Sequence, residues 1–232
     1  MNPELQVPFR TKICGVTTTA DAEILASAEC DAIGLNFYRQ SPRYVSPEQG
    51  REIGQGLSLV RVGVFVNSGE SELREIAETA DLDYVQLHGD EPPELIAELQ
   101  GFQLIPGFQV IRAFRCKDEG LEPIISYLAE CERLAALPSA ILLDAYSPNA
   151  YGGTGEVIDW SSIKALRTEI APKIAIVLAG GLTAGNVAEA IRAGVPDGVD
   201  TASGVESEPG IKDETQVNDF IKNAKNQYDL PG

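Results

Sequence analysis

Eight short segments rich in valine, isoleucine and leucine recur along the chain, and a segment of helical pattern follows each of them. Parallel strands joined by helices form only a few architectures, so this alternation constrains the fold more than any other feature. The predicted strands cover residues 9–14, 31–37, 60–66, 83–88, 109–114, 140–145, 173–179 and 197–202. The predicted helices cover residues 18–29, 47–57, 69–80, 91–100, 119–136, 159–170, 184–194 and 213–226. Ser46 and Thr183 are the predicted N-caps of the second and seventh helices.

The strands are almost continuously apolar, as expected for a parallel sheet that is covered on both faces. Eight strand–helix pairs in 232 residues fit a compact (β/α)8 barrel, the TIM barrel of the α/β class. A doubly wound sheet is the alternative, but no GxGxxG motif follows the first strand. Because no linker or low-complexity tract interrupts the pattern, we expect a single domain over residues 1–232.

The composition narrows the classes of partner. Apolar residues make up 44% of the chain and charged residues 23%, which is ordinary for a soluble globular protein. The formal net charge is −17, from 35 acidic and 18 basic residues. Polyphosphate and anionic lipid surfaces repel such a chain, so we expect neither nucleic acid nor a membrane as partner. An anionic ligand must instead be held locally, by an arginine, by backbone N–H groups or by a helix N-terminus.

The cysteines Cys14, Cys30, Cys116 and Cys131 show no CxxC or CxxH spacing, and no secretory leader precedes them. We therefore expect free thiols in a reducing cytosol, and hence a cytoplasmic protein. Because His88 is the only histidine, a histidine-rich zinc site is excluded. The sequence shows no other metal-binding or nucleotide-binding motif, so we expect neither a metal nor a cofactor.

In a TIM barrel the active site lies at the carboxyl ends of the strands, so residues there are candidates for chemistry. Cys14 is the last residue of the first predicted strand, beside a flexible Gly15. Asp144 ends an otherwise apolar run in the sixth, where burying a carboxylate for packing alone is costly. The alternatives are a packing cysteine and an aspartate that only caps a turn or helix. Segment 151–155 is glycine-rich, typical of a loop that closes over a ligand or of a plain flexible connection.

Two glycine-containing loops follow the seventh and eighth predicted strands. Gly180 and Gly181 lie in the first, and Ser203 and Gly204 supply a hydroxyl and backbone donors in the second. Glycines without Cβ let backbone N–H groups approach an anion, and these two loops often bind phosphate in TIM barrels. Together they favour a phosphate site over the alternative that the glycines only make tight turns.

Four further polar residues have two interpretations each. Lys12 shares a strand face with Cys14, so it either lowers the pKa of the thiol or pairs with an acid inside the barrel. Asp200 is either a barrel-interior ion-pair partner or a group that binds a substrate hydroxyl near the phosphate. Arg43 is able to hold a planar carboxylate and His88 to act as an acid or base. A solvated surface arginine and a structural histidine are the ordinary alternatives.

Seven segments resemble, in order and spacing, the motifs of the phosphoribosylanthranilate isomerases of tryptophan biosynthesis. They are KICGVT, SPRYVS, VGVFVN, VQLHGDE, LLDAYSPNAYGGTG, LAGGLTAGNV and GVDTASGVES. The resemblance covers nearly the whole chain. It implies a TIM barrel that acts without cofactor or metal on a phosphorylated sugar–anthranilate substrate. The implied reaction is the Amadori rearrangement of N-(5-phosphoribosyl)anthranilate to 1-(2-carboxyphenylamino)-1-deoxyribulose 5-phosphate.

The resemblance also implies roles for individual residues. Cys14 would be the general base and Asp144 the general acid, with their pKa values shifted in opposite directions by the folded site. Arg43 would hold the anthranilate carboxylate. The phosphate would be cradled by Gly180, Gly181, Ser203 and Gly204.

Two other functions stay open. A histidine-pathway aminoaldose isomerase acts on a related phosphorylated sugar with two aspartates, and the cysteine at the end of the first strand argues against it. A non-catalytic barrel would bind its ligand without turnover. The expected assembly is a monomer or a homodimer.

Overall fold

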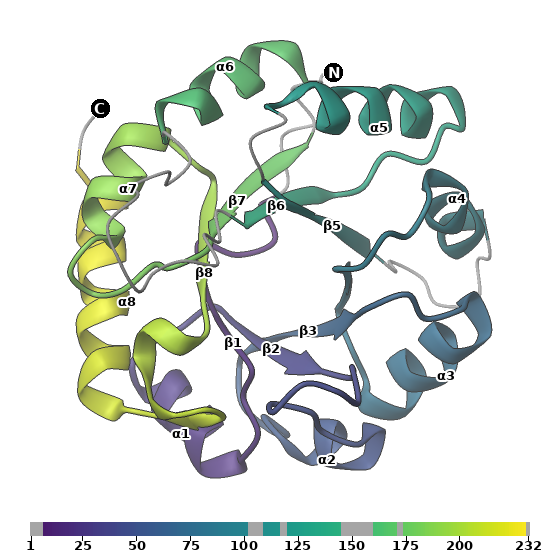
Figure 1. Cartoon of the computed structure of the whole chain (residues 1–232). Coiled ribbons are helices and arrows are strands. Elements are labelled where there is room, and N and C mark those ends of the chain that lie inside the picture. Colours follow the sequence, from purple (N-terminus) through teal and green to yellow (C-terminus); the bar gives the residue numbers. More distant parts are fainter. Residues whose placement is uncertain (1–6, 102–108, 117–119, 145–159, 171–173, 231–232) are drawn as a thin grey trace.

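The computed structural model describes residues 7–101, 109–116, 120–144, 160–170 and 174–230. Within them, eight parallel strands form a closed barrel with helices around it (Figure 1). The strands are β1 Thr11–Cys14, β2 Ala32–Asn36, β3 Val60–Phe65, β4 Tyr84–Leu87, β5 Gln109–Arg115, β6 Ala140–Asp144, β7 Ala175–Ala179 and β8 Gly198–Thr201. The helices are α1 Thr19–Ser27, α2 Pro47–Glu52, α3 Glu70–Ala80, α4 Pro93–Gly101, α5 Glu122–Arg133, α6 Ser161–Glu169, α7 Val187–Gly194 and α8 Glu214–Tyr228.

The barrel closes because β1 pairs in parallel with both β2 and β8. The order of the strands around the barrel is their order in the sequence, as a succession of strand–helix units requires. The predicted TIM barrel is therefore confirmed, and the doubly wound sheet is wrong. The predicted boundaries at residues 119, 145, 159 and 173 lie outside the described residues.

The second helix starts as predicted but ends early. The Ser46 side chain accepts a hydrogen bond from the backbone N–H of Gln49, whose side chain in turn accepts one from the N–H of Ser46. This capping box fixes the start of α2. The helix ends at Glu52 because Gly54 and Gly56 adopt left-handed φ angles of 79° and 77°, which no right-handed helix contains.

The seventh helix starts later than predicted, so Thr183 is not its N-cap. Asn186 accepts a hydrogen bond from the backbone N–H of Thr183 at 2.8 Å and donates one to the carbonyl of Gly181 at 3.0 Å. These bonds close a separate turn, and α7 begins only at Val187. The turn leaves the backbone around Gly181 outside the helix.

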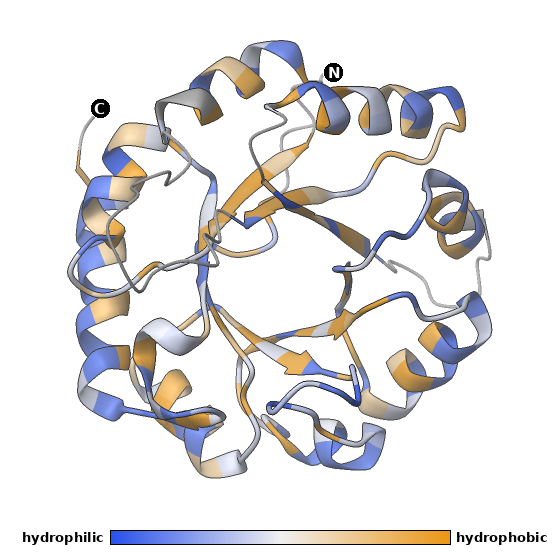
Figure 2. Ribbon diagram, in the orientation of Figure 1, coloured by the Kyte–Doolittle hydropathy of each residue, from blue (hydrophilic) through white to orange (hydrophobic). Residues whose placement is uncertain are grey.

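Apolar residues cover both faces of the strands, inside the barrel and outside it. Alternate strand residues such as Ala32, Val62 and Leu142 fill the barrel interior. The residues between them, such as Ile33 and Leu143, pack outward against the helices. Figure 2 accordingly shows strands that are mostly apolar and helices that combine apolar and polar residues. No helix in the described part of the chain is long and apolar enough to cross a membrane.

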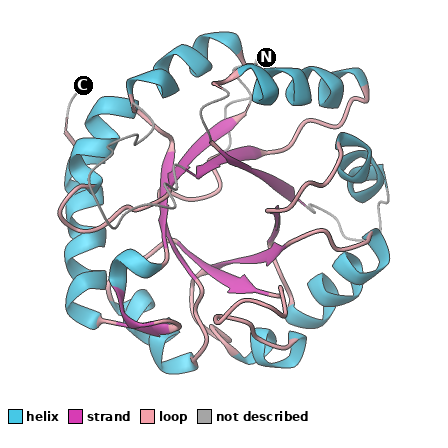
Figure 3. Ribbon diagram, in the orientation of Figure 1, coloured by secondary structure: helices cyan, strands magenta, loops and turns pink. Residues whose placement is uncertain are grey.

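A small hairpin between β8 and α8 was not predicted. It follows the short helix η1 (Ser203–Val205) and pairs β9 (Glu206–Glu208) with β10 (Ile211–Lys212) in antiparallel orientation. Figure 3 shows the hairpin outside the ring of barrel strands, close to α1. Its position brings Glu206 and Lys212 to the end of β1, as described below.

Candidate active site

Several polar side chains face the barrel interior at or near the carboxyl ends of the strands. Successive side chains in a strand point to opposite faces. Ile13 packs outward against the helices, so Lys12 and Cys14 on either side of it point inward. The same alternation applies around the outward-facing residues of β4, β6 and β8. The inward-facing polar residues include Lys12, Cys14, Gln86, His88, Asp144 and Asp200, and the same alternation turns Asn36 of β2 and Arg115 of β5 inward.

Lys12 and Asp200 form a buried ion pair on the same interior surface as Cys14. Nζ of Lys12 donates a hydrogen bond to Oδ2 of Asp200 at 2.8 Å, and the side chains are 0% and 7% exposed. The two residues lie opposite each other in the pairing of β1 with β8. The interpretation of both as a barrel-interior ion pair is therefore confirmed. Oδ1 of Asp200 is buried and has no hydrogen-bond partner among the described residues.

The pKa of the Cys14 thiol is raised. Burial is the largest cause, the nearby Asp200 carboxylate adds to it, and the Lys12 and Lys212 ammonium groups oppose it. Lys12 thus acts to lower the pKa of the thiol, as one interpretation of the sequence predicted, but burial outweighs the two cations and the net shift is upward. Burial therefore favours the neutral thiol.

Asp144 ends β6 beside His88, which follows β4. Oδ2 of Asp144 lies 3.4 Å from Nε2 of His88, and both side chains are 21% exposed. Nδ1 of the same imidazole lies 3.0 Å from the side-chain nitrogen of Gln86. The imidazole thus bridges the buried Gln86 and the carboxylate at the rim. His88 lies in the candidate site and not only in the core.

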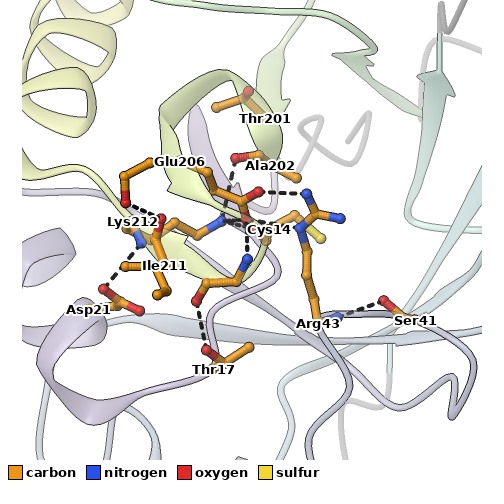
Figure 4. Close-up of polar contacts among 12 residues, drawn as sticks. Cys14, Thr17, Asp21, Ser41, Arg43, Thr201, Ala202, Glu206, Ile211 and Lys212 are labelled. Atoms are coloured by element: carbon orange, nitrogen blue, oxygen red, sulfur yellow. Dashed lines mark hydrogen bonds and ion pairs between the residues drawn. The ribbon is translucent and has the colours of Figure 1, made fainter.

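Arg43 reaches the end of β1 from the loop between β2 and α2. Its Nε and Nη2 donate to Oε1 and Oε2 of Glu206 at 2.8 and 2.5 Å, and this contact raises the pKa of the guanidinium (Figure 4). Gly15 makes room for the arginine, because a Cβ at that position would lie 2.3 Å from Cδ of Arg43. Gly15 also has a φ of +72°, which favours glycine. Arg43 therefore lies against the backbone next to Cys14.

The two predicted phosphate loops lie against each other. Gly180 and Gly181 adopt φ angles of +89° and +64° after β7. A Cβ on Gly204 would lie only 1.9 Å from the carbonyl oxygen of Leu182, and Thr201 donates a hydrogen bond to the same oxygen at 2.7 Å. Gly204 therefore lets the two loops approach closely, whereas Gly180 and Gly181 are favoured by their left-handed φ angles.

Ser203 and Gly204 open the short helix η1. The first N–H groups of a helix have no acceptor within it, so they are available to an anion. The structure thus brings all four predicted phosphate residues to one side of the rim, between β7 and β8.

Sequence interpretation missed three residues of the site, Gln86, Glu206 and Lys212. Glu206 and Lys212 lie in polar, acidic stretches that are typical of solvated surface, yet their side chains are 4% and 0% exposed. Gly210, between two short polar runs, was the one available signal of a hairpin that would bury them. Segment 151–155, the predicted closing loop, lies outside the described residues.

No cluster of three or more His, Cys, Asp or Glu side chains suited to a metal ion occurs in the part of the chain that the structure describes. The inward-facing groups offer a thiol, a carboxyl and an imidazole for proton transfer. Arg43 and the two glycine loops offer positive charge and N–H donors for anions. A ligand with two anionic groups and a site for proton transfer between them fits this arrangement.

Known proteins of one family are similar to this chain over most of its length. The model of the family described as N-(5'phosphoribosyl)anthranilate (PRA) isomerase matches residues 11–223. A curated relative from Geobacter metallireducens, named N-(5'-phosphoribosyl)anthranilate isomerase, is 45% identical over 219 residues, which cover 93% of this chain and 98% of the relative.

Two solved structures are similar over 94% of this chain and 99% of their own. The phosphoribosyl anthranilate isomerase from Thermotoga maritima is 39% identical with a TM-score of 0.80. The second, a phosphoribosyl anthranilate isomerase in complex with reduced 1-(o-carboxyphenylamino)-1-deoxyribulose 5-phosphate, is 37% identical with a TM-score of 0.78.

Proposed function

The chain belongs to the N-(5'-phosphoribosyl)anthranilate isomerase family, and we propose that it catalyses one step of tryptophan biosynthesis through Cys14 and Asp144. The step is the Amadori rearrangement of N-(5-phosphoribosyl)anthranilate to 1-(2-carboxyphenylamino)-1-deoxyribulose 5-phosphate. One observation carries the assignment of residues. Cys14 and Asp144 both face the barrel interior at the same rim, from β1 and β6, with the phosphate loops of β7 and β8 between them.

The proposed seating of the substrate uses its two anionic ends. The phosphate lies at the backbone N–H groups of Gly180, Gly181, Ser203 and Gly204. The anthranilate carboxylate pairs with Arg43. Because these two groups are fixed at different points of the rim, the ribose lies between them over the barrel interior. Oδ1 of Asp200, which has no hydrogen-bond partner among the described residues, would accept a hydrogen bond from a ribose hydroxyl that reaches into the barrel interior.

Asp144 acts first, as the general acid. Its carboxyl group donates a proton to the ribose ring oxygen while the C1–O bond breaks. The lone pair of the anilino nitrogen forms the C1=N bond, so the product of this step is an open-chain iminium ion and an aspartate carboxylate. His88, 3.4 Å from Asp144, is placed to hold the carboxyl group in position during the transfer.

Cys14 acts second, as the general base. Its thiolate removes the C2 proton, the C–H electrons form the C1=C2 bond, and the iminium electrons return to nitrogen. The resulting enolamine tautomerises to the ketone. The thiol must first release its own proton to water, and the cationic iminium adds a third positive charge to those of Lys12 and Lys212, which favour the thiolate against the effect of burial. The thiolate form of Cys14 is thereby favoured when the C2 proton is to be removed.

The remaining expectations about the setting of the enzyme stay predictions. We expect a cytoplasmic enzyme that binds neither nucleic acid nor membranes and that is a monomer or a homodimer. Sedimentation equilibrium distinguishes the two assemblies.

A fluorescence assay tests the proposed function. N-(5-phosphoribosyl)anthranilate is generated in situ, and the loss of its anthranilate-type fluorescence is followed with the wild type, with Asp144→Asn and with Asp219→Asn. Asp219 is an exposed residue of α8 and serves as the matched control. We expect turnover by the wild type, a fall in kcat of about a hundredfold or more in Asp144→Asn, and no change in the control. Absence of wild-type turnover contradicts the isomerase assignment and favours the histidine-pathway or non-catalytic alternative.

A further inference from the structure

Glu206 lies between two cations at the end of β1. Arg43 donates two hydrogen bonds to its carboxylate, and Nζ of Lys212 donates a third to Oε1 at 2.7 Å (Figure 4). The Glu206 side chain is only 4% exposed. Burial opposes its ionisation, but the hydrogen bonds from Arg43 and Lys212 outweigh burial and lower its pKa. The carboxylate is therefore ionised, and both of its oxygens accept hydrogen bonds from within the protein.

Lys212 ties this carboxylate to the backbone of the catalytic rim. Besides Glu206, its Nζ donates to the carbonyl oxygen of Cys14 at 2.6 Å and to that of Ala202 at 3.4 Å. An ammonium group has three N–H donors, and these three acceptors use all of them. Lys212 thus joins the ends of β1 and β8 to Glu206.

The hairpin that carries both residues is also fixed to the region around β1. Thr17 donates a hydrogen bond to the carbonyl oxygen of Gly210 at 2.7 Å, and the backbone N–H of Lys212 donates to Asp21 at 3.4 Å. The backbone N–H of Gly210 donates to Oε1 of Glu206 at 3.3 Å. The position of the Glu206 carboxylate is therefore set by contacts on both sides of it.

This arrangement determines what Arg43 can still bind. A guanidinium has five N–H donors in a planar fork. Glu206 uses the edge formed by Nε and Nη2, which leaves Nη1 and the second N–H of Nη2 as one free edge that has no acceptor among the described residues. That edge matches one further carboxylate. Together the three side chains carry two positive charges and one negative charge, so a net positive charge remains for an anion.

We propose that Glu206, held by Lys212, is a positioning residue that orients Arg43 so that its free edge faces the carboxylate of the substrate. The inference rests on the proposed function, in which Arg43 binds the anthranilate carboxylate. Arg43 on its own has a long side chain with many rotamers, and ordering it on binding costs affinity. With Glu206 in place this ordering precedes binding. The trio Arg43–Glu206–Lys212 therefore selects ligands with a carboxylate on the aromatic ring.

The test compares two ligands that differ only in this carboxylate. One is reduced 1-(o-carboxyphenylamino)-1-deoxyribulose 5-phosphate, and the other has a phenyl ring in place of the carboxyphenyl ring. In Glu206→Gln we expect affinity for the first ligand to fall about tenfold to a hundredfold, as for loss of a charged contact, and affinity for the second to stay nearly unchanged. KM for the substrate should rise more than kcat falls. Glu208→Gln, an exposed position in the same hairpin, is the matched control.

Two further variants separate the possible outcomes. Arg43→Lys keeps the charge but cannot contact Glu206 with two parallel hydrogen bonds, so it should also lose selectivity for the carboxylate ligand, and it serves if Glu206→Gln does not fold. Glu206→Asp keeps the charge and should recover part of the affinity. Arg43→Ala tests the proposed function itself, which fails if that variant still prefers the carboxylate ligand. If Arg43→Ala loses the preference but Glu206→Gln keeps it, or binds the carboxylate ligand more tightly, only the positioning role is overturned.

Discussion

Nζ of Lys12 lies 2.8 Å from Oδ2 of Asp200 inside the barrel, and Lys12 is completely buried. Two charges withdrawn from water stabilise a fold little as a pair, but either of them alone is costly. The pair also sets the charge next to Cys14, since Lys12 lowers and Asp200 raises the pKa of the thiol. The same ion pair therefore has two effects. Each charge compensates the other inside the barrel, and both charges act on the pKa of the proposed base.

Removal of one partner should destabilise the protein. Lys12→Met leaves Asp200 buried without its cation, so we expect the free energy of unfolding to fall by about 3–5 kcal/mol in urea denaturation. The double variant Lys12→Met/Asp200→Leu should recover most of the loss. Asp229→Asn, which breaks an exposed ion pair with Arg10, should cost less than about 1 kcal/mol. A double variant as unstable as Lys12→Met contradicts this account.

Stability should fall at alkaline pH. Burial raises the pKa of Cys30 to about 12 and of Cys131 to about 11, from an ordinary 9.0, and that of Tyr127 to about 12, from 10.0. The unfolded chain therefore releases these protons at lower pH than the folded protein does. The contribution is complete below pH 9.0 and is lost as pH rises toward the folded-state values. Urea denaturation under reducing conditions between pH 7 and 11 checks this, and a constant unfolding free energy contradicts it.

The two proposed phosphate loops should tolerate no side chain at Gly204. A Cβ there would lie 1.9 Å from the carbonyl oxygen of Leu182, so Gly204→Ala must separate the two loops. We expect at least about a tenfold loss of affinity for inorganic phosphate in calorimetry, as for loss of a charged hydrogen bond. Gly185→Ala is the matched control, because its nearest contact is 3.7 Å away. Equal affinities in the two variants would remove Gly204 from the proposed site.

His88 should support Asp144 without replacing it. His88→Gln removes the imidazole that lies 3.4 Å from the carboxylate, so the orientation of the proposed acid is less well fixed. We expect kcat to fall about tenfold, less than in Asp144→Asn, with little change in KM. A fall as large as that of Asp144→Asn indicates that His88 transfers the proton itself.

The barrel, the end positions of Cys14 and Asp144 and the glycine-containing loops after β7 and β8 were predictable because they depend on local pattern. A strand end is marked by the last apolar residue, and the barrel then places all such ends at one rim. The contact between Arg43 and Glu206 was not predictable in this way. It joins residues 163 positions apart and depends on the short hairpin Glu206–Lys212, which carries no strong apolar signal.

The direction of the pKa shift of Cys14 could not be predicted from the sequence for a different reason. It is the net result of burial, two cations and one carboxylate that act in opposite directions. Spacing along β1 places Lys12 on the same face as the thiol, but it does not give the depth of the sulfur or the position of Lys212. The sign of the net shift depends on those two quantities.

The most direct test of the central claim is the kcat of Cys14→Ala for N-(5-phosphoribosyl)anthranilate, beside that of Cys116→Ala. Cys116 is a second half-buried cysteine at the same rim. If Cys14 removes the C2 proton, kcat falls by about a hundredfold or more in Cys14→Ala, while affinity for the reduced product analogue and the kcat of Cys116→Ala stay near wild type. Turnover by Cys14→Ala at the wild-type rate contradicts the account and assigns the base to another group.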